Sequence, residues 1–343
     1  MVHINGWAEL DGTILSLSDL TEIQGNSSKI RRLGGEFFIA WDDGSRARDM
    51  YGVMLGDCPT GTYICSEGTN NPLLESSTSP SLSHAIETAV RLRADTSHTT
   101  DTCVTALSGV DSALIAAISR TPCITVGMTG SHDLQQAART ASLCGLDLYT
   151  KSIYGTDVED ALPLVMKCTQ HLSMTPVDIA IGVALWFIGE TAKEQGYTRL
   201  LSGQRADELF GGYHRYASCN GSHDEIDQLF TKDWETIKHQ NLRDQTIAHA
   251  HGAWLSMPYL DTRVVSAARS IPPSDHLMNG IRKYQLRRAA LHYLPREIAC
   301  HTKKAMQYGT GIAKEIKRLA RRHGFGTQIS AYLNAIQDAE ALT

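Results

Sequence analysis

Residues 102–118 decide the fold and have the sequence Thr102-Cys-Val-Thr-Ala-Leu-Ser-Gly-Val-Asp-Ser-Ala-Leu-Ile-Ala-Ala-Ile118. Cys103 to Leu107 is short, apolar and β-prone, whereas Ser112 to Ile118 is rich in Ala, Leu and Ile and favours a helix. Between them, Ser108 and Gly109 carry too little side chain to cover their backbone N–H groups. Such a loop, with the helix N-terminus behind it, can point these donors at an anion. The stretch therefore predicts a strand, a phosphate-binding loop and a helix.

Asp111 separates this loop from ordinary phosphate loops, and the Lys of the Walker pattern is missing. A carboxylate beside a phosphate repels it unless a divalent cation lies between them, and Mg²⁺ favours carboxylate and phosphate oxygens together. The alternative is a plain strand-to-helix turn in which Asp111 or Ser112 caps the helix. These residues alone leave both interpretations open.

Strands and helices alternate along the following part of the chain. We expect helices at His84–Arg93, Leu134–Cys144 and Asp178–Ile188, and strands at Cys123–Met128, Leu146–Ile153 and Arg199–Ser202. This alternation predicts an α/β fold with a doubly wound parallel sheet, whose ligand site lies at the carboxyl ends of the strands. Beyond Gly221 the pattern is mostly helical.

The N-terminal part of the chain, to about Gly68, has a β pattern. Its short apolar runs, separated by Gly, Asp and Asn turns, are Gly12–Leu17, Glu36–Trp41 and Thr62–Cys65. The polar tract Thr69–Ser83 predicts an exposed linker. We therefore expect a small, mainly β domain at residues 1–75 and a large domain at residues 84–343.

Composition excludes several classes of protein. The 343 residues are 42% hydrophobic and carry a net charge of −5, and their 32 Lys and Arg residues are dispersed except in Arg282–Arg288 and Lys314–Arg322. This charge gives no support to a dedicated nucleic-acid binder. The eight cysteines form no CxxC pair, which is typical of buried thiols in a reducing cytoplasm. With neither a signal-peptide pattern nor a run of membrane-spanning length, we expect a cytoplasmic protein without a membrane partner.

A second loop has the same arrangement as the first, with a strand, a Ser-Gly pair and then a carboxylate. It has the sequence Leu201-Ser-Gly-Gln-Arg-Ala-Asp-Glu-Leu-Phe-Gly-Gly-Tyr213, in which a strand leads into Ser202-Gly203 and then to Asp207 and Glu208. In a parallel sheet both loops leave the same edge, so Asp111 and Asp207 could share one metal ion. Alternatively, Asp207 and Glu208 only favour a helix N-terminus. That alternative explains the charges but not the Gly-Gly pair.

These motifs resemble a known family. Ser108–Ser112 resembles the pyrophosphate loop of N-type ATP pyrophosphatases, and Ser202–Tyr213 resembles the matching motif of asparagine synthetases. Further elements are similar in order: Val126–Asp133, Met257-Pro-Tyr-Leu-Asp261, Lys283-Tyr-Gln-Leu-Arg287 and Lys303-Lys-Ala-Met-Gln-Tyr-Gly309, the last being nearest to asparagine synthetase domain-containing proteins. The resemblance runs from His84 to about Lys317. It implies an adenine-nucleotide α-hydrolase-like fold.

The resemblance also implies a reaction and its residues. A carboxylate would attack the α-phosphorus of ATP, giving an acyl adenylate and pyrophosphate, and ammonia would then displace AMP. By this resemblance, the ATP phosphates would be bound by Ser108, Gly109 and Ser112, and the rest of the nucleotide would contact Leu107, Val126, Ser202 and Gly203. Mg²⁺ would be held by Asp111 and Asp207. The catalytic residues would be Lys283, Asp207 and Glu208. Alternatively, Lys283 is an ordinary solvated lysine.

The chain also departs from the family pattern. Its first loop has one Gly after Ser108 where the family has two, and Gln204-Arg205 replaces a Glu-Gly pair whose carboxylate helps amination. Gln cannot accept a proton from ammonium, which leaves Glu208 or water. Ser256 and His301 stand where arginines are expected. We therefore expect a pocket that differs from that of the aspartate-specific enzymes.

The N-terminal segment resembles part of the family's glutaminase domain. Gly34–Asp42 and Ala47–Val53 look like its later strands, but its nucleophile is an N-terminal cysteine, and here no Cys precedes Cys58. We expect a truncated segment without glutaminase activity, and ammonia from solution or from a separate glutaminase subunit. A homodimer is also among the expected partners. The alternatives are a nucleic-acid-modifying sulfurtransferase, which would need a cysteine such as Cys103 or Cys219, and a non-catalytic ATP-binding relative.

Overall fold

The chain folds into two compact units. The computed structural model describes residues 1–75, 81–94, 101–218, 223–301 and 306–341. Unit 1 comprises Met1–Asp95, Gln204–Leu242 and Ser256–Ala289, and unit 2 comprises Thr96–Gly203, Arg243–Leu255 and Ala290–Thr343. Each unit is described by itself below.

Unit 1 contains a six-stranded antiparallel sheet in the order β2-β1-β3-β4-β5-β6. Its strands are β1 (Val2–Leu10), β2 (Thr13–Ile14), β3 (Gly34–Trp41), β4 (Arg46–Arg48), β5 (Thr62–Ile64) and β6 (Asn70–Pro72), with the short helices α1 (Leu17–Glu22) and α2 (Ser27–Ile30). Phe37, Ile39 and Trp41 of β3 are buried at its core. The strands predicted near Glu36 and Thr62 are confirmed, while β1 was not predicted.

Two predictions for this segment were wrong. The run expected as a strand from Gly12 to Leu17 is a strand only at Thr13–Ile14, because Ser16 forms a capping box that starts helix α1. The expected linker begins with β6, which pairs antiparallel with β5. A polar edge strand lacks the apolar alternation by which strands are recognised. Residues 76–80 of that linker lie outside the described residues.

The rest of unit 1 is helical. Its elements are α3 (Leu82–Arg93), α8 (Ala206–Phe210), η1 (His214–Ser218), α9 (His223–Glu235), η2 (Pro258–Leu260), α11 (Thr262–Arg269), η3 (Pro273–Gly280) and α12 (Tyr284–Ala290), while α10 (Ile237–His249) runs from unit 1 into unit 2. Helix α3 confirms the prediction at His84–Arg93. The mostly helical pattern predicted after Gly221 is also confirmed.

A buried charge network joins three segments of unit 1. The Glu36 carboxylate of β3 accepts hydrogen bonds from Arg93 Nε at 2.8 Å and from the Met257 N–H at 2.7 Å. Arg93 also donates to Asp261 Oδ2 at 2.8 Å. Burial alone would raise the pKa of Asp261, but the charges of Arg93 and Arg263 hold that pKa at about 2. The compact unit therefore continues past residues 75–84, and the domain boundary expected there stays a prediction.

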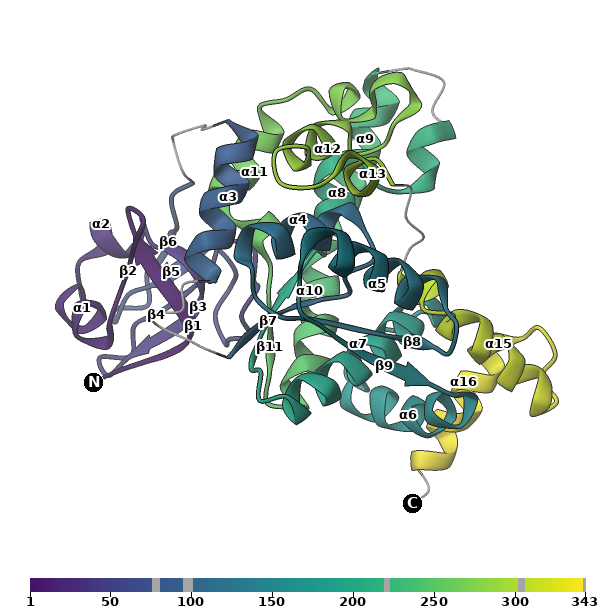
Figure 1. Cartoon of the computed structure of the whole chain (residues 1–343). Helices are drawn as coiled ribbons and strands as arrows, with labels where there is room; N and C mark the ends of the chain where they lie inside the picture. The colour runs from purple at the N-terminus through teal and green to yellow at the C-terminus, as the bar shows by residue number, and fades with distance from the viewer. Residues whose placement is uncertain (76–80, 95–100, 219–222, 302–305, 342–343) are drawn as a thin grey trace. The chain divides into compact units, whose positions relative to one another are not determined.

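Unit 2 is built on a five-stranded sheet in the order β11-β10-β7-β8-β9. Its strands are β7 (Thr102–Thr105), β8 (Cys123–Met128), β9 (Leu148–Ile153), β10 (Arg199–Ser202) and β11 (Trp254–Ser256). From β10 to β9 all neighbouring strands are parallel. Figure 1 shows α4 (Val110–Ser119) and α5 (His132–Cys144) over one face, and α6 (Gly155–Cys168) and α7 (Pro176–Glu194) over the other. The predicted doubly wound parallel sheet is confirmed.

Local signals explain these helices. Helix α7 starts at a capping box formed by Thr175 and Asp178, and it is buried on most faces, as expected. A Cβ atom at Gly182 would lie 2.9 Å from Val165 Cγ1 of α6, so this glycine allows close packing of the two helices. Helix α6 was not predicted, and Pro163 lies inside it. The C-terminal helices of unit 2 are α13 (Arg296–Ala299), α14 (Met306–Gly309), α15 (Ile312–Arg322) and α16 (Ile329–Ala341).

The cysteines only partly follow the expectation. Among the described residues, Cys58, Cys103 and Cys123 are buried free thiols, whereas the free thiol of Cys300 is exposed. Cys219 lies outside the described residues. Within the described ranges, every helix is too short or too polar to cross a membrane.

Candidate functional site

The two Ser-Gly loops meet at one edge of the parallel sheet in unit 2. Strands β7 and β10 are parallel neighbours, with Ser202 opposite Thr105. A Cβ atom at Gly203 would lie 2.7 Å from the Ser112 nitrogen and 3.0 Å from Asp111 Cβ. Only glycine allows so close an approach of backbone to backbone. The prediction that both loops leave the same edge is confirmed for Ser108–Ser112 and Ser202–Gly203.

The first loop is tighter than expected. Ala106 adopts a left-handed conformation with φ of 57°, and the Ser108 N–H donates to Ala106 O at 2.6 Å. The expectation that this N–H points at an anion was therefore wrong, because the turn at Ala106 uses it. The Ser112 hydroxyl also donates to Ala106 O, at 2.7 Å, and so holds the loop against the helix.

Helix α4 begins without a side-chain cap. Gly109 is the N-cap residue and has no side chain with which to cap the helix. Asp111 and Ser112 lie inside the helix, so the alternative that one of them is the N-cap was wrong. The first-turn N–H groups have no acceptor within their own helix, and the helix dipole adds partial positive charge there. This helix start is suited to binding an anion.

Asp111 gives this helix start a negative charge. Its residue is only 2% exposed, in the first turn of α4. A buried carboxylate next to an anion site is costly unless a cation compensates it. Within the described part of the chain, no cluster of three His, Cys, Asp or Glu side chains could hold a metal by itself. Mg²⁺ commonly uses one or two carboxylates together with substrate phosphates, so the donor set fits it.

The side chains of Leu107 and of Val126 in β8 are buried. The Leu107 N–H donates to Thr125 Oγ1 of β8 at 3.1 Å, which ties the loop to the neighbouring strand. Thr125 was not predicted as part of the site. A threonine inside a strand carries no signal of this contact in the sequence.

A second cluster lies in unit 1, where Lys283 Nζ is 2.7 Å from Asp207 Oδ1. Lys283 is 3% exposed, so the alternative of a solvated lysine was wrong. A Cβ atom at Gly212 would lie 1.8 Å from Asp207 Oδ1 and 2.2 Å from Lys283 Cε. Gly211, with φ of 68°, ends α8 in the left-handed conformation. Gly211 is therefore explained by its left-handed conformation, and Gly212 by the space that the Asp207–Lys283 pair needs. The alternative that Asp207 and Glu208 only favour a helix N-terminus explained neither glycine.

Glu208 belongs to the same cluster and is 3% exposed. The Tyr213 hydroxyl donates to Glu208 Oε1 at 2.5 Å. Burial raises the pKa of Tyr213, and the neighbouring charge of Glu208 raises it further, so the tyrosine stays a protonated donor. Tyr213 was not predicted, although it closes the second motif.

Arg205 occupies the position at which the family pattern has its second glycine. It adopts φ of 69° and is buried. Its guanidinium donates to Asn241 Oδ1 at 2.7 Å and to Gln240 Oε1 at 2.8 Å, both on α10. A left-handed conformation is the reason for glycine at such a position. In this chain Arg205 adopts the left-handed conformation in place of glycine, and its side chain is held by the two hydrogen bonds to α10.

The other motifs lie in both units. Ser256 Oγ donates to Glu36 Oε2 at 2.5 Å, so this residue belongs to the buried network of unit 1. In unit 2, Gly309 packs on Asp133, with a built Cβ 2.1 Å from Asp133 Oδ1. Residues 302–305 of the C-terminal basic motif lie outside the described residues.

The predicted site residues thus form two groups, each inside one unit. Leu107, Ser108, Gly109, Asp111, Ser112, Val126, Ser202 and Gly203 are in unit 2, and Asp207, Glu208 and Lys283 are in unit 1. Metal binding by Asp111 and Asp207 together stays a prediction.

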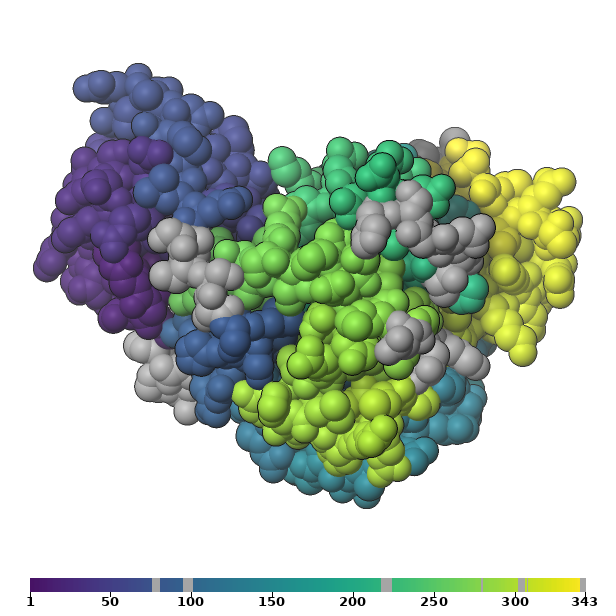
Figure 2. Space-filling model, turned by 90° about the horizontal axis from the view of Figure 1, so that it is seen from above, coloured from purple at the N-terminus to yellow at the C-terminus, as the bar shows by residue number. Residues whose placement is uncertain are grey.

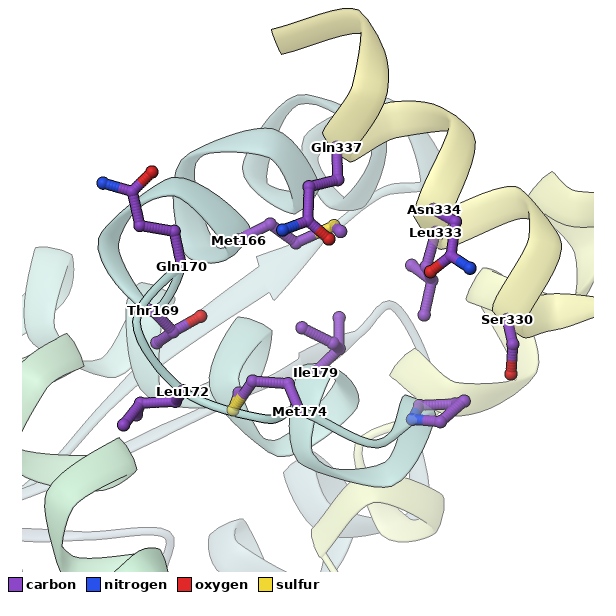
Figure 3. A pocket seen from close by; sticks show the side chains of 11 residues that line it. Met166, Thr169, Gln170, Leu172, Met174, Ile179, Ser330, Leu333, Asn334 and Gln337 are labelled. Carbon is purple, nitrogen blue, oxygen red and sulfur yellow. The ribbon is translucent and has the colours of Figure 1, made fainter. Parts of the chain in front are cut away.

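A pocket lies elsewhere in unit 2 (Figure 3). It is formed by α6, α7, α16 and the loop before α7, and all of its lining side chains are uncharged: Met166, Thr169, Gln170, Leu172, Met174, Pro176, Ile179, Ser330, Leu333, Asn334 and Gln337. It contains no predicted site residue. Without a charged group, its lining does not suit a nucleotide phosphate.

The cysteine required by the sulfurtransferase alternative is unfavourable. Cys103 lies in β7 and is completely buried, and burial raises the pKa of its thiol. A reactive cysteine needs a stabilised thiolate and access to its substrate. Cys103 therefore gives this alternative no support, and Cys219 lies outside the described residues.

Known proteins are similar in sequence to this chain. A putative asparagine synthetase of Methanocaldococcus jannaschii is 33% identical over 269 residues, which are 67% of this chain and 49% of that protein. An asparagine synthetase domain-containing protein of Saccharomyces cerevisiae is 30% identical over 168 residues, 44% of this chain and 30% of that protein. The chain thus spans about half the length, or less, of these relatives.

Structural comparison adds little to this. A glutamine-dependent NAD⁺ synthetase from Acinetobacter baumannii aligns over 76% of this chain and 53% of its own, with 14% identity and a TM-score of 0.30, too low for any argument. The family model described as asparagine synthase matches residues 81–229 and 218–335, which together are most of the sequence. On this evidence the chain belongs to the asparagine synthase family.

Proposed function

We propose that the protein is an ATP-dependent ligase that forms an amide from a carboxylate and ammonia, with release of AMP and pyrophosphate. A carboxylate does not react with ammonia until one of its oxygens becomes a good leaving group. Transfer of the adenylyl group of ATP to that oxygen supplies the leaving group. The chain must therefore bind the nucleotide and stabilise charge on the departing pyrophosphate.

One observation carries this proposal: the backbone of Gly203 lies against the first turn of α4. This contact places the uncapped helix start and the second Ser-Gly loop at one edge of the sheet, where α/β proteins bind ligands. The N–H groups of Gly109 and of the first turn of α4 would bind phosphate oxygens. Ser112 would keep the loop in place through its bond to Ala106.

Mg²⁺ would accompany the nucleotide. Asp111 would hold it, and Asp207 is expected to contribute the second carboxylate. When bound, the ion would neutralise negative charge on the phosphate oxygens.

Lys283 and Asp207 would form the catalytic pair. In unit 1 they neutralise each other across 2.7 Å, and Gly212 leaves them the space to do so. Because Lys283 is buried, its ammonium group would act on a phosphate more strongly than a solvated lysine does. Glu208 is fixed by Tyr213 and is available as the proton acceptor that Gln204 cannot be.

Ammonia would come from solution or from a separate glutaminase. In the N-terminal segment Cys58 is buried, and burial raises the pKa of its thiol, which disfavours it as a glutaminase nucleophile. The carboxylate substrate would differ from that of the aspartate-specific enzymes. Ser256, in place of an expected arginine, is hydrogen-bonded to Glu36 and offers no positive charge to a substrate.

The test is a panel of carboxylic acids assayed for acid-dependent pyrophosphate release from ATP, once with ammonium and once with glutamine. Asp111→Asn removes a charge at nearly constant volume and should abolish release while the fold remains. Its matched control is Asp244→Asn, a buried carboxylate of the same unit on helix α10 that belongs to none of the motifs. Full activity of Asp111→Asn, or the same loss in both variants, would contradict the assignment of Asp111.

A further inference from the structure

The solvent-exposed face of helix α15 is entirely basic. The helix runs from Ile312 to Arg322 near the C-terminal end of the chain, which is yellow in Figures 1 and 2. All of its exposed positions carry Lys or Arg: Lys314, Lys317, Arg318, Arg321 and Arg322. Its one acidic residue, Glu315, is buried. These five residues are called the α15 basic face.

Two of the five have carboxylate partners. Arg318 pairs with Glu315 at 2.6 Å, and Arg322 pairs with Glu159 of α6. For Lys314, Lys317 and Arg321, no carboxylate of the described residues lies within ion-pair distance. Their spacing of three and four residues puts them in one row along the helix. The row extends over about 10 Å, because each residue advances the helix by about 1.5 Å.

Stability explains only the end of this face, where Arg321 and Arg322 lie in the last turn and the helix dipole favours cations. Like charges three or four residues apart destabilise a helix by about 0.2–0.5 kcal/mol per pair. The helix is held instead by its opposite side, where Ile312, Ile316 and Leu319 are buried. A face built only for solvation usually mixes both signs of charge. The single sign thus indicates an anionic partner.

The chemistry of the face selects the class of partner. A helix that lies on a lipid surface buries an apolar face in it, but the apolar face of α15 is packed inside unit 2. A protein partner normally needs apolar or aromatic anchors, and the five exposed side chains offer none. The phosphate backbone of a nucleic acid needs only positive charge and hydrogen-bond donors. The net charge of −5 gave no support for such binding, but charge averaged over the chain conceals a local row of cations.

We propose that the α15 basic face binds the phosphate backbone of nucleic acid. This binding is independent of the proposed ligase activity. Three unpaired cations predict a slope of about −2.7 for log K against log salt on a duplex, so affinity should fall about 40-fold between 50 and 200 mM salt. Such binding reads charge and not sequence, and its Kd at physiological salt should lie on the order of 10⁻⁴ to 10⁻⁶ M.

The experiment measures fluorescence anisotropy of a labelled 20-base-pair RNA duplex and of a DNA duplex of the same length, titrated with the full chain at several salt concentrations. The test variant is Lys314→Glu/Lys317→Glu/Arg321→Glu. The control, Lys29→Glu/Lys232→Glu/Lys238→Glu, reverses three exposed lysines of unit 1 and changes the net charge equally. Thermal unfolding of both variants checks that each remains folded.

We expect binding by the wild type and the control, at least a tenfold loss of affinity in the test variant, and a salt slope that is smaller by two to three in magnitude. Equal losses in both variants would show that net charge alone matters and would overturn the proposal. The proposal would also be overturned if the protein bound neither duplex at 50 mM salt. Binding to vesicles of phosphatidylserine and phosphatidylcholine without binding to the duplexes would identify a lipid surface instead.

Discussion

Replacing Gly212 by Ala tests the Asp207–Lys283 pair without touching either partner. The new Cβ would lie 1.8 Å from Asp207 Oδ1 and 2.2 Å from Lys283 Cε. Both atoms are ends of side chains, and Gly212 does not have positive φ, so the ion pair has to move while the backbone can stay. The displacement needed to reach ordinary contact is roughly 1 Å or more.

A displacement of this size should affect activity far more than stability. Misplacing a catalytic group by about 1 Å costs on the order of 10² in rate. Overpacking lowers the free energy of unfolding by about 1–3 kcal/mol. Replacing Gly by Ala also makes the unfolded chain less flexible, which raises the free energy of unfolding by about 0.4–1 kcal/mol. We therefore expect kcat for pyrophosphate release to fall about 100-fold, with a loss of unfolding free energy near 1 kcal/mol.

The assay combines steady-state kinetics with urea unfolding of the same preparations. The control is Gly182→Ala, whose Cβ would lie 2.9 Å from Val165 and 3.0 Å from Ile247, inside unit 2 and away from the motif residues. It should lose stability by overpacking and keep its kcat. Wild-type kcat in folded Gly212→Ala would refute the catalytic role of the pair.

Further predictions follow from the same structure. Lys283→Met should lower kcat by on the order of 10² to 10³ and change ATP affinity only several-fold, since charge on the leaving pyrophosphate is greatest in the transition state; an effect on nucleotide affinity alone, seen by calorimetry, would contradict this. The purified protein should form no glutamate from glutamine, and glutamate formation that survives purification would disprove this. The ammonium-dependent rate of Glu208→Gln should rise with pH, because only NH₃ is nucleophilic and this variant lacks the proposed proton acceptor. The pKa of Asp261 in the folded protein, about 2, is below its usual value of 3.8, so its contribution of about 2 kcal/mol is present above pH 4 and lost as the pH falls towards 2. Urea unfolding between pH 2 and 5 should show that loss in the wild type and not in Asp261→Asn.

Much of unit 2 could be predicted because its signals are local. Strands β8 and β10 were predicted with their observed ends, since short apolar runs bounded by turn residues identify buried parallel strands. Gly145 ends α5 in the left-handed conformation, as its position indicated. Pro163 in α6 is an exception to a rule that usually holds, because a helix can keep a proline when packing stabilises it.

The candidate site was less predictable because its contacts are tertiary. Ala106, Arg205 and Lys283 adopt left-handed conformations that non-glycine residues rarely take, so the sequence shows no sign of them. The space that Gly212 leaves depends on Lys283, which is distant in sequence. The Ser-Gly loops, by contrast, follow neighbouring strands of one sheet, and topology alone was enough to bring them together.

The central claim is that this chain activates a carboxylate by cleaving ATP between its α and β phosphates. Exchange of labelled pyrophosphate into ATP, measured with the acid found in the panel and without ammonia, tests it most directly because exchange requires a reversible adenylation step. We expect acid-dependent exchange in the wild type and none in Asp111→Asn. Tight ATP binding without exchange across the panel, or release of ADP and phosphate in place of AMP and pyrophosphate, would contradict the account.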